Sequence, residues 1–377
     1  MPFAMVAGEA SGDLLGATLM DGLLARWPRT TAHGIGGPRM IERGFEAWWP
    51  AETLALHGYA EALVRYRELV GIRARLRERL IASPPRAFIG IDAPDFNLDL
   101  EGALKARGIR TVHYVCPSIW AWRADRVHKI KASCDRVLCL FPFEPPLLEK
   151  HGIAATYVGH PLANAIPLDP DKSAARAALG LPGDAEVVAI LPGSRGSEVK
   201  HLAERFFRAA LQLAQLRSGV HFVVPAVPSM KARIEAAARA AGLQRHLTIV
   251  TGQSHTVLAA CDVALVASGT ATLEAALFKR PMVIAYSVHW FSWVLMRPRK
   301  LQPWVGLPNI LAGDFVVPEL LQQDAKPERL VRALLDWLAA PDRMAAVQEE
   351  FRALHLQLRR DTAKLATDAI EETIRQD

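Results

Sequence analysis

The feature that most restricts the fold of this 377-residue chain is a buried strand that runs directly into a glycine-rich turn and a helix. Residues 187–191 (Val-Val-Ala-Ile-Leu) are apolar without alternation, which is typical of a parallel strand covered on both faces. The turn at 192–196 (Pro-Gly-Ser-Arg-Gly) then places backbone N–H groups at the start of a helix beginning near Ser197. Such a helix start binds anions, Gly193 and Gly196 allow a close approach, and Arg195 adds donors that suit phosphate. The alternative is an ordinary turn with an exposed arginine.

A second strand–turn–helix unit follows in the same half of the chain. Residues 264–267 predict a short buried strand, and Ser268-Gly-Thr270 forms the turn, where Thr270 or Thr272 can cap the helix. Glu274 lies in the first turns of that helix, where a carboxylate can accept the hydroxyls of a ribose. Taken alone, Glu274 is explained equally well by a favourable interaction of its carboxylate with the positive helix N-terminus. Two such units together favour a nucleotide site.

Strands and helices alternate along the whole chain, which predicts parallel, doubly wound sheets. The expected strands are 3–6, 31–35, 87–91, 111–115, 136–139, 156–158, 187–191, 221–224, 247–250, 263–266 and 282–285. The expected fold is therefore α/β, with two Rossmann-like parallel-sheet domains that face a central cleft and with C-terminal helices. The expected boundaries are a first domain at 1–165, a second domain at 166–340 and C-terminal helices at 341–377. The stretch 159–171, with its three prolines, is the expected linker.

Composition narrows the class of protein further. The formal net charge of +6 fits anionic partners such as nucleotides or phospholipid surfaces. The four cysteines show neither zinc spacing nor a disulfide framework. The chain enters its first strand without the pattern of a signal peptide, and no apolar run is long enough to predict a membrane-spanning helix.

Two loops of the first half follow strands at the edge where ligands bind. In 8–16 (Gly-Glu-Ala-Ser-Gly-Asp-Leu-Leu-Gly), Ser11 or Asp13 either faces a ligand or caps the next helix. In 90–97, Asp92 and Asp95 stand three residues apart at a strand end, where a carboxylate can take a proton from an attacking hydroxyl. The residues alone favour the other reading, in which Asp95 or Asn97 caps a helix starting near Leu98.

A third loop, 116–123, carries Trp120 and Trp122 beside a proline. Tryptophans in such a place form either part of the core or a platform for a sugar or acyl group, and core packing is the default.

Several segments taken together resemble lipid-A-disaccharide synthases, which are inverting glycosyltransferases of the two-domain GT-B-like class. The matching segments span most of the chain in order, and they are 7–13 (Ala-Gly-Glu-Ala-Ser-Gly-Asp), 91–97 (Ile-Asp-Ala-Pro-Asp-Phe-Asn), 120–122 (Trp-Ala-Trp), 158–161 (Val-Gly-His-Pro), 191–196 (Leu-Pro-Gly-Ser-Arg-Gly), 267–270 (Ala-Ser-Gly-Thr) with Glu274, and 307–313 (Leu-Pro-Asn-Ile-Leu-Ala-Gly). The resemblance implies transfer from UDP-2,3-diacylglucosamine to 2,3-diacylglucosamine 1-phosphate, which gives a β-1,6-linked disaccharide and UDP.

The resemblance also implies roles for particular residues. It places the diphosphate on Gly193, Ser194 and Arg195, and the rest of the nucleotide on Ser268, Gly269, Thr270, Glu274 and Asn309. For Asp95, the resemblance favours the role of catalytic base over helix capping. Asp92 is the alternative base. The acceptor side would include Ser11, Trp120 and Trp122. No cofactor and no metal are expected, because Asp169 and Asp171 lie in the linker, where a cap or a solvated turn explains them.

Lipid substrates would require contact with a bilayer at the cytoplasmic face of the bacterial inner membrane. The first candidate is 63–81, a helix with an apolar stripe and six arginines. The second is 289–300, where Trp290, Phe291 and Trp293 precede a basic cluster. A solvated charged helix and a core helix are the respective alternatives. Another basic run, with Arg123, Arg126, Lys129 and Lys131, either meets the acceptor phosphate or forms a solvated helix.

Two other functions remain open from the residues alone. A UDP-sugar epimerase of the same fold would act on water-soluble sugars, and a non-enzymatic nucleotide-binding protein at the membrane would turn nothing over. The chain has no groove-reading motif, so no nucleic-acid partner is expected. A homodimer is left open.

Overall fold

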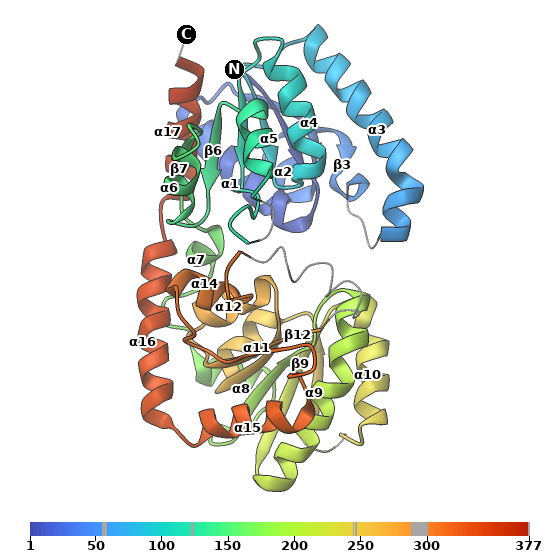
Figure 1. Ribbon diagram of the computed structural model, residues 1–377, viewed down its shortest axis with the longest axis vertical. Helices are drawn as coiled ribbons and strands as arrows, with labels where there is room; N and C mark the ends of the chain where they lie inside the picture. The colour runs from blue at the N-terminus through green and yellow to red at the C-terminus, as the bar shows by residue number, and fades with distance from the viewer. Residues whose placement is uncertain (55–58, 122–123, 244, 246, 288–300, 376–377) are drawn as a thin grey trace. The chain divides into compact units, whose positions relative to one another are not determined.

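The computed structural model describes the whole chain except residues 55–58, 122–123, 244, 246, 288–300 and 376–377. The chain divides into two compact units, each with its own sheet (Figure 1). The first unit comprises Met1–Pro161 and Leu358–Asp377, and the second comprises Leu162–Gln357. The boundary after Pro161 falls inside the proline-rich stretch 159–171.

The first unit is built on a seven-stranded parallel sheet with the order β3-β2-β1-β4-β5-β6-β7. Its strands are β1 (Pro2–Ala7), β2 (Thr31–Gly36), β3 (Phe45–Pro50), β4 (Ala87–Ile91), β5 (Thr111–Tyr114), β6 (Arg136–Cys139) and β7 (Ala154–Tyr157). Its helices are α1 (Ala10–Arg26), α2 (Pro38–Ile41), α3 (Tyr59–Ala82), α4 (Pro94–Lys105), α5 (Arg126–Ser133), α6 (Glu144–Glu149) and α17 (Thr362–Arg375). The short α7 (Pro161–Ala165) lies at the boundary between the units.

Helices cover both faces of this sheet because side chains alternate along each buried strand. Phe3 and Met5 of β1 belong to a core that includes α1 and α17, whereas Ala4 and Val6 belong to a second core with α3 and α4. Helix α17 therefore returns from the second unit to the first and packs on α1 and the sheet through Ile370 and its neighbours. Residues 341–377, which we expected to form separate C-terminal helices, are divided between the units.

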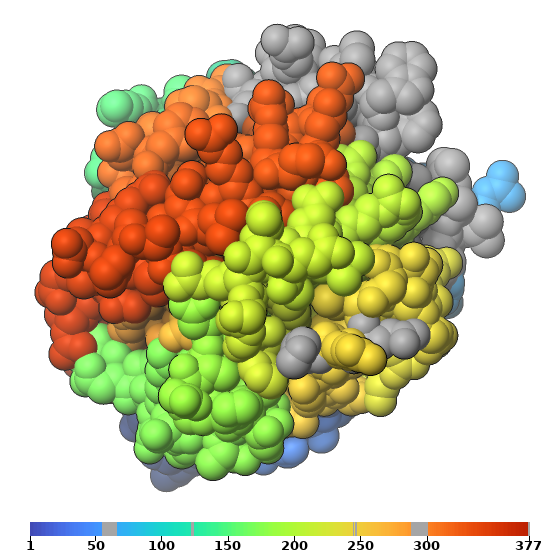
Figure 2. All heavy atoms as spheres, turned by 90° about the horizontal axis from the view of Figure 1, so that it is seen from below, coloured from blue at the N-terminus to red at the C-terminus, as the bar shows by residue number. Residues whose placement is uncertain are grey.

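The second unit holds a six-stranded parallel sheet with the order β10-β9-β8-β11-β12-β13. Its strands are β8 (Glu186–Leu191), β9 (Val220–Ala226), β10 (Leu247–Thr251), β11 (Val263–Ala267), β12 (Met282–Tyr286) and β13 (Glu319–Leu321). Its helices are α8 (Lys172–Ala178), α9 (Gly196–Leu216), α10 (Lys231–Ala240), α11 (Ser254–Ala260), α12 (Thr270–Leu277), α14 (Leu307–Ala312), α15 (Pro327–Leu338) and α16 (Pro341–Leu358). Helix α15 packs against α9, as the orange-red and yellow-green surfaces in Figure 2 show.

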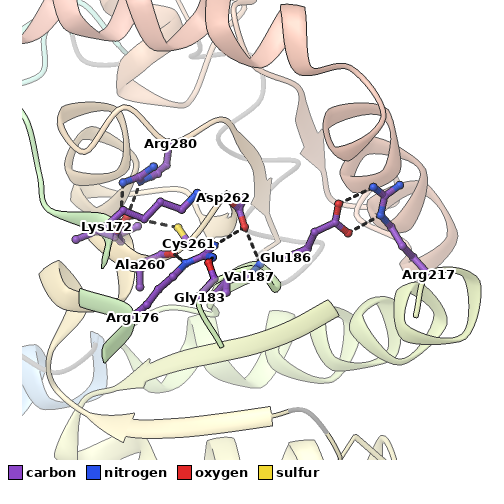
Figure 3. A network of polar contacts seen from close by, with 12 residues as sticks. Lys172, Arg176, Gly183, Glu186, Val187, Arg217, Ala260, Cys261, Asp262 and Arg280 are labelled. Atoms are coloured by element: carbon purple, nitrogen blue, oxygen red, sulfur yellow. Dashed lines mark hydrogen bonds and ion pairs between the residues drawn. The ribbon is translucent and has the colours of Figure 1, made fainter. Parts of the chain in front are cut away.

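Charged side chains fix the amino-terminal edge of the second sheet (Figure 3). The Asp262 carboxylate accepts hydrogen bonds from the Val187 backbone and the Arg176 guanidinium, each at 2.8 Å, and pairs with Lys172. Because Asp262 immediately precedes β11 and Val187 lies in β8, this carboxylate fixes the register of the two strands. Their opposite ends carry the candidate site.

The predicted α/β class with two parallel Rossmann-like sheets is confirmed. Two strands were missing from the prediction, and both are edge strands. β3 has mostly half-exposed side chains and ends at a proline, and β13 is only three residues long. Neither produces the continuous apolar run that identified the central strands.

Candidate active site

The two predicted loops of the second unit lie side by side at the point where the strand order reverses. From β8 the chain continues outward to β9 and β10 and then returns to β11 on the other side of β8. Leu191 of β8 pairs in register with Val266 of β11, so the loops at 192–195 and 268–269 leave the sheet next to each other. Ligands of open α/β sheets bind at such a switch point.

An acidic side chain already occupies part of the predicted anion cradle. One oxygen of Glu198, Oε2, accepts hydrogen bonds from the backbone N–H groups of Ser194 at 3.0 Å and Arg195 at 3.2 Å. Gly193 has φ of +112°, and a Cβ on it would lie 2.4 Å from the Cβ of Glu198. The Glu198 side chain therefore takes up part of the space beside Gly193, where we predicted the close approach of a ligand.

Exposed cations and donors remain available around that carboxylate. The side chains of Ser194 and Arg195 are exposed, and Arg195 is the N-cap of α9. The Nη1 atom of Arg233, from α10, lies 3.0 Å from the place that a Cβ on Gly196 would take. Arg233 was not predicted, because it belongs to no motif and comes near the loop only through the packing of α10 on α9. The start of α9 thus combines two guanidinium groups with the positive end of a helix.

The second loop presents a half-buried serine and a half-buried carboxylate. The Ser268 hydroxyl donates to the Val305 carbonyl at 3.1 Å, and the N-cap of α12 is Gly269. The predicted threonine cap is wrong, since no side chain caps α12 and the Thr272 hydroxyl donates to the Gly269 carbonyl. Exposed Thr270 is the first residue of the helix.

Glu274 lies one turn further along α12 and has a histidine neighbour that was not predicted. The Nε2 atom of His255, from α11, lies 4.0 Å from its carboxylate. Burial raises the pKa of the Glu274 carboxyl and lowers the pKa of the His255 imidazole. His255 follows β10 at the ligand-binding edge, and this position was the one sequence signal for it.

Asn309 is fully buried, and its amide is bound by the protein itself. Its Nδ2 donates to the Val317 carbonyl and to Glu319, each at 2.9 Å, and its Oδ1 accepts from the Val317 N–H at 3.0 Å. Glu319 also binds the N–H groups of Val305 and Gly306. Asn309 therefore shapes the 305–309 segment, whose Val305 carbonyl holds Ser268.

In the first unit, the switch point lies between β1 and β4, and a buried asparagine joins the two strand ends. Asn97 is completely buried, and its Nδ2 donates to the Asp92 carbonyl at 2.8 Å and lies 3.4 Å from the Val6 carbonyl. Asp92 and Ala93 both have positive φ, +53° and +42°, which costs backbone energy in residues other than glycine. The exposed Asp92 side chain therefore projects from a strained turn that Asn97 holds.

Asp95 lies in the first turn of α4, which begins at Pro94 with Ala93 as its N-cap. The expectation that Asp95 or Asn97 caps a helix near Leu98 is wrong, because the helix starts earlier and no side chain caps it. The Asp95 carboxylate is 82% exposed and pairs with the guanidinium of Arg126. Of the basic run predicted near the acceptor, Arg126 thus lies beside the candidate base.

The first-unit loop after β1 contains one side chain that faces inward and one that faces outward. Asp13 is buried and accepts hydrogen bonds from the N–H groups of Gly37, Arg39 and Met40 at 3.0 to 3.1 Å. It therefore caps α2, and not the helix in which it lies. Ser11 is exposed in the first turn of α1, whose N-cap is Glu9.

Trp120 is half-buried, and its indole nitrogen donates to Glu144 at 3.0 Å. Its ring also packs edge-on against Phe141 and Phe143.

The buried Glu144 carboxylate beside Trp120 accepts a second hydrogen bond from the Phe141 N–H, and burial raises the pKa of Glu144 to about 7. The pKa of nearby His160, stacked on Phe141, falls to about 4 because its imidazole is buried. Trp120 is therefore fixed in an aromatic cluster at the end of β6.

The remaining predicted positions divide into two groups. Trp122, Trp290, Phe291 and Trp293 lie outside the described residues. Asp171 caps α8 by accepting from the Ala174 N–H at 2.9 Å, and Asp169 pairs with Arg352. Among the described residues, no three His, Cys, Asp or Glu side chains lie together as a metal site would need. The four cysteines are buried and free.

The two parallel-sheet units define a protein of the two-domain GT-B fold class. Two solved structures share the fold. UDP-GlcNAc 2-epimerase from Neisseria meningitidis has a TM-score of 0.67 at 12% identity, with each chain fully covered. MurG from Acinetobacter baumannii has a TM-score of 0.60 at 14% identity, with 98% of this chain and 99% of that chain covered.

Sequence comparison identifies the family. The model of the lipid-A-disaccharide synthetase family matches residues 3–373. A lipid-A-disaccharide synthase of Albidiferax ferrireducens is 62% identical over 98% of this chain and 97% of its own length. The enzyme of that name from Burkholderia mallei is 52% identical over 98% and 96%. The chain belongs to the lipid-A-disaccharide synthase family.

Proposed function

We propose that the chain transfers 2,3-diacylglucosamine from its UDP derivative to 2,3-diacylglucosamine 1-phosphate and releases UDP. The observation that carries this proposal is the pair of loops, Gly193–Arg195 and Ser268–Thr270, adjacent at the switch point of the second sheet in a member of this family. The diphosphate would bind at the start of α9 with Arg195 and Arg233, and the ribose hydroxyls would bind Glu274.

The reaction is a single displacement that inverts the anomeric carbon. The acceptor 6-hydroxyl oxygen forms a bond to that carbon, the bond from the carbon to the UDP oxygen breaks, and a base takes the hydroxyl proton. Asp95 is our candidate base, with Asp92 as the alternative, since both follow β4 at the ligand-binding edge of the first unit. Arg126 beside Asp95 would meet the acceptor phosphate. The charge on the departing UDP would be stabilised by Arg195 and the start of α9, so the step needs no metal.

The acylated substrates would be met at the cytoplasmic face of the inner membrane. None of the helices that the structure describes is both long and apolar enough to span a bilayer. In α3, the apolar residues Ile72, Leu76 and Leu80 face the core of the first unit, so the candidate contact is the stretch 66–71, just before them. There Tyr66 is 63% and Val70 37% exposed next to arginines. The proposed contact of Trp290, Phe291 and Trp293 rests on sequence alone.

The test is incubation with both acylated sugars, with detection of UDP and the disaccharide phosphate. Arg195→Ala and Glu274→Ala should weaken UDP binding about tenfold or more and lower turnover. Arg208→Ala is the matched control, because this exposed arginine on the same helix pairs only weakly with Glu204. Epimerised UDP-sugar without disaccharide would replace the proposal with an epimerase. UDP affinity unchanged in both site variants would refute the site.

Membrane contact has its own test. Tyr66→Ser with Val70→Ser should reduce flotation with vesicles of phosphatidylglycerol and leave UDP affinity unchanged. Leu216→Ser is the control, since Leu216 is 68% exposed at the end of α9 in the second unit. If the parent chain does not float with such vesicles, the proposed surface is wrong.

A further inference from the structure

The carboxylate of Glu198 sits where the first loop would receive a phosphate. Its Oε2 is bound by two successive N–H groups, those of Ser194 and Arg195, at 3.0 and 3.2 Å. Consecutive N–H groups that converge in this way form a nest for an anion. The nest fits Glu198 closely, since a Cβ on Gly193 would lie 2.5 Å from the same Oε2 atom.

The Glu198 carboxylate lies among positive groups that would attract a bound diphosphate, so its negative charge would weaken that attraction. Glu198 lies in the first turn of α9, where the helix end and the guanidinium groups of Arg195 and Arg233 are positive. A negative charge in that turn lowers the positive potential. It also repels a second anion that binds there.

We propose that Glu198 is a built-in competitor for the donor diphosphate, one that weakens the binding of UDP and thereby favours its release. The inference rests on the proposed function, because it needs the diphosphate to bind at this loop. Glu198 weakens UDP binding whether or not its side chain moves when UDP binds. If it stays in the nest, two like charges lie close together. If it leaves, the phosphate must replace the two hydrogen bonds that Glu198 makes.

Two substitutions separate the charge of Glu198 from its hydrogen bonds. Glu198→Gln keeps an oxygen that can accept from Ser194 and Arg195 and removes the charge. Glu198→Asp keeps the charge and shortens the side chain, so the nest loses its occupant. Glu204→Gln is the control, because it makes the same charge change six residues, roughly 9 Å, further along the helix.

The measurement is calorimetric titration of UDP, with uridine as a probe that lacks phosphate. Glu198→Gln should bind UDP about tenfold more tightly, which corresponds to about 1.4 kcal/mol, and should leave uridine binding unchanged. Glu198→Asp frees the two N–H groups but keeps the charge, so it should tighten UDP binding clearly less than Glu198→Gln does. Glu204→Gln should stay within about twofold of the parent. Melting temperatures show whether each variant is folded.

The remaining outcomes overturn the inference in distinguishable ways. Unchanged or weaker UDP binding in Glu198→Gln, with the expected loss in Arg195→Ala, would refute the competition and leave the donor site standing. Equal tightening by Gln and Asp would show that a looser loop, and not charge, is responsible. If Arg195→Ala also leaves UDP affinity unchanged, the donor site itself is misplaced and the inference falls with it.

Discussion

Replacing Asp95 by asparagine separates a catalytic role from a structural one. The Asp95 carboxylate is 82% exposed and pairs with Arg126. An exposed ion pair contributes about 0 to 1 kcal/mol, and a carboxylate in the first helical turn contributes about 0.3 to 1 kcal/mol. Because Ala93 is the N-cap, Asp95→Asn removes no cap. The expected loss of stability is therefore about 1 kcal/mol, or a fall of about 2 to 4 °C in melting temperature.

The expected loss of turnover is far larger than this loss of stability. A positioned general base contributes roughly 10²- to 10⁴-fold to the rate, and the asparagine amide cannot accept the proton. Asp95→Asn should therefore lose at least about a hundredfold in kcat and keep its affinity for UDP. Steady-state rates with both acylated sugars, together with melting curves and UDP titration, give all three quantities.

Two further variants make the result decisive. Asp99→Asn is the matched control, since Asp99 lies one turn along α4 and pairs with Arg73 and Lys129 in the same charged surface. It should change turnover by less than about threefold. Asp92→Asn should keep its stability, because asparagine tolerates the positive φ of +53° at that position. If Asp95→Asn and Asp92→Asn both keep turnover within about threefold of the parent, neither carboxylate is the base.

Three more outcomes are expected. Asn97→Ala should lower stability by roughly 1 to 3 kcal/mol, because buried carbonyls lose their donor, and should lower kcat more than it raises KM. A chemical-denaturation series with rates checks this, and a change in KM alone would contradict it. EDTA should leave turnover unchanged, and a loss restored by Mg²⁺ would contradict the metal-free step. Glu144 has a folded pKa of about 7, above its usual 4.5, so its contribution to stability is present at low pH and declines as pH rises from about 4.5 to 7. Glu144→Gln lacks this titration, so its stability relative to the parent should be greater at pH 8 than at pH 5 in thermal melts. A constant difference would contradict the raised pKa.

The sequence predicted the central strands well because their signal is local. β4 and β6 were predicted with their observed bounds, since each is a short run of residues buried on both faces. The edge strands β3 and β13 were missed because half-exposed residues do not form such runs. The return of α17 to the first unit was also missed, since amphipathic spacing shows that a helix has a buried face but not which core it joins.

Loop positions could be predicted, but the partners of loop side chains could not. Parallel strands end at one edge of a sheet, so a polar residue directly after a strand was correctly placed near the switch points. The buried carboxylate of Asp13 binds N–H groups more than twenty residues away, and Asn309 binds across to 317–319. No short-range pattern encodes these contacts, because they depend on how separate loops pack together.

The sequence does not show whether a polar side chain in these loops binds a ligand or the protein's own backbone, because both uses need the same hydrogen-bonding groups. A carboxylate or amide that suits a ligand in a glycine-rich turn also suits a backbone N–H or carbonyl group of the protein, so spacing alone cannot separate the two uses. What separates them is whether the side chain's hydrogen-bonding groups are already used. Asp13 and Asn309 are buried with their polar atoms bound to the main chain, whereas Arg195, Ser11 and Asp92 keep exposed side chains. Glu198 stands between these groups, because it is bound by N–H groups that a phosphate would also use. A diphosphate bound at this loop would therefore compete with Glu198 for the same N–H groups, and removal of the Glu198 charge is the change that we expect to affect UDP affinity most directly.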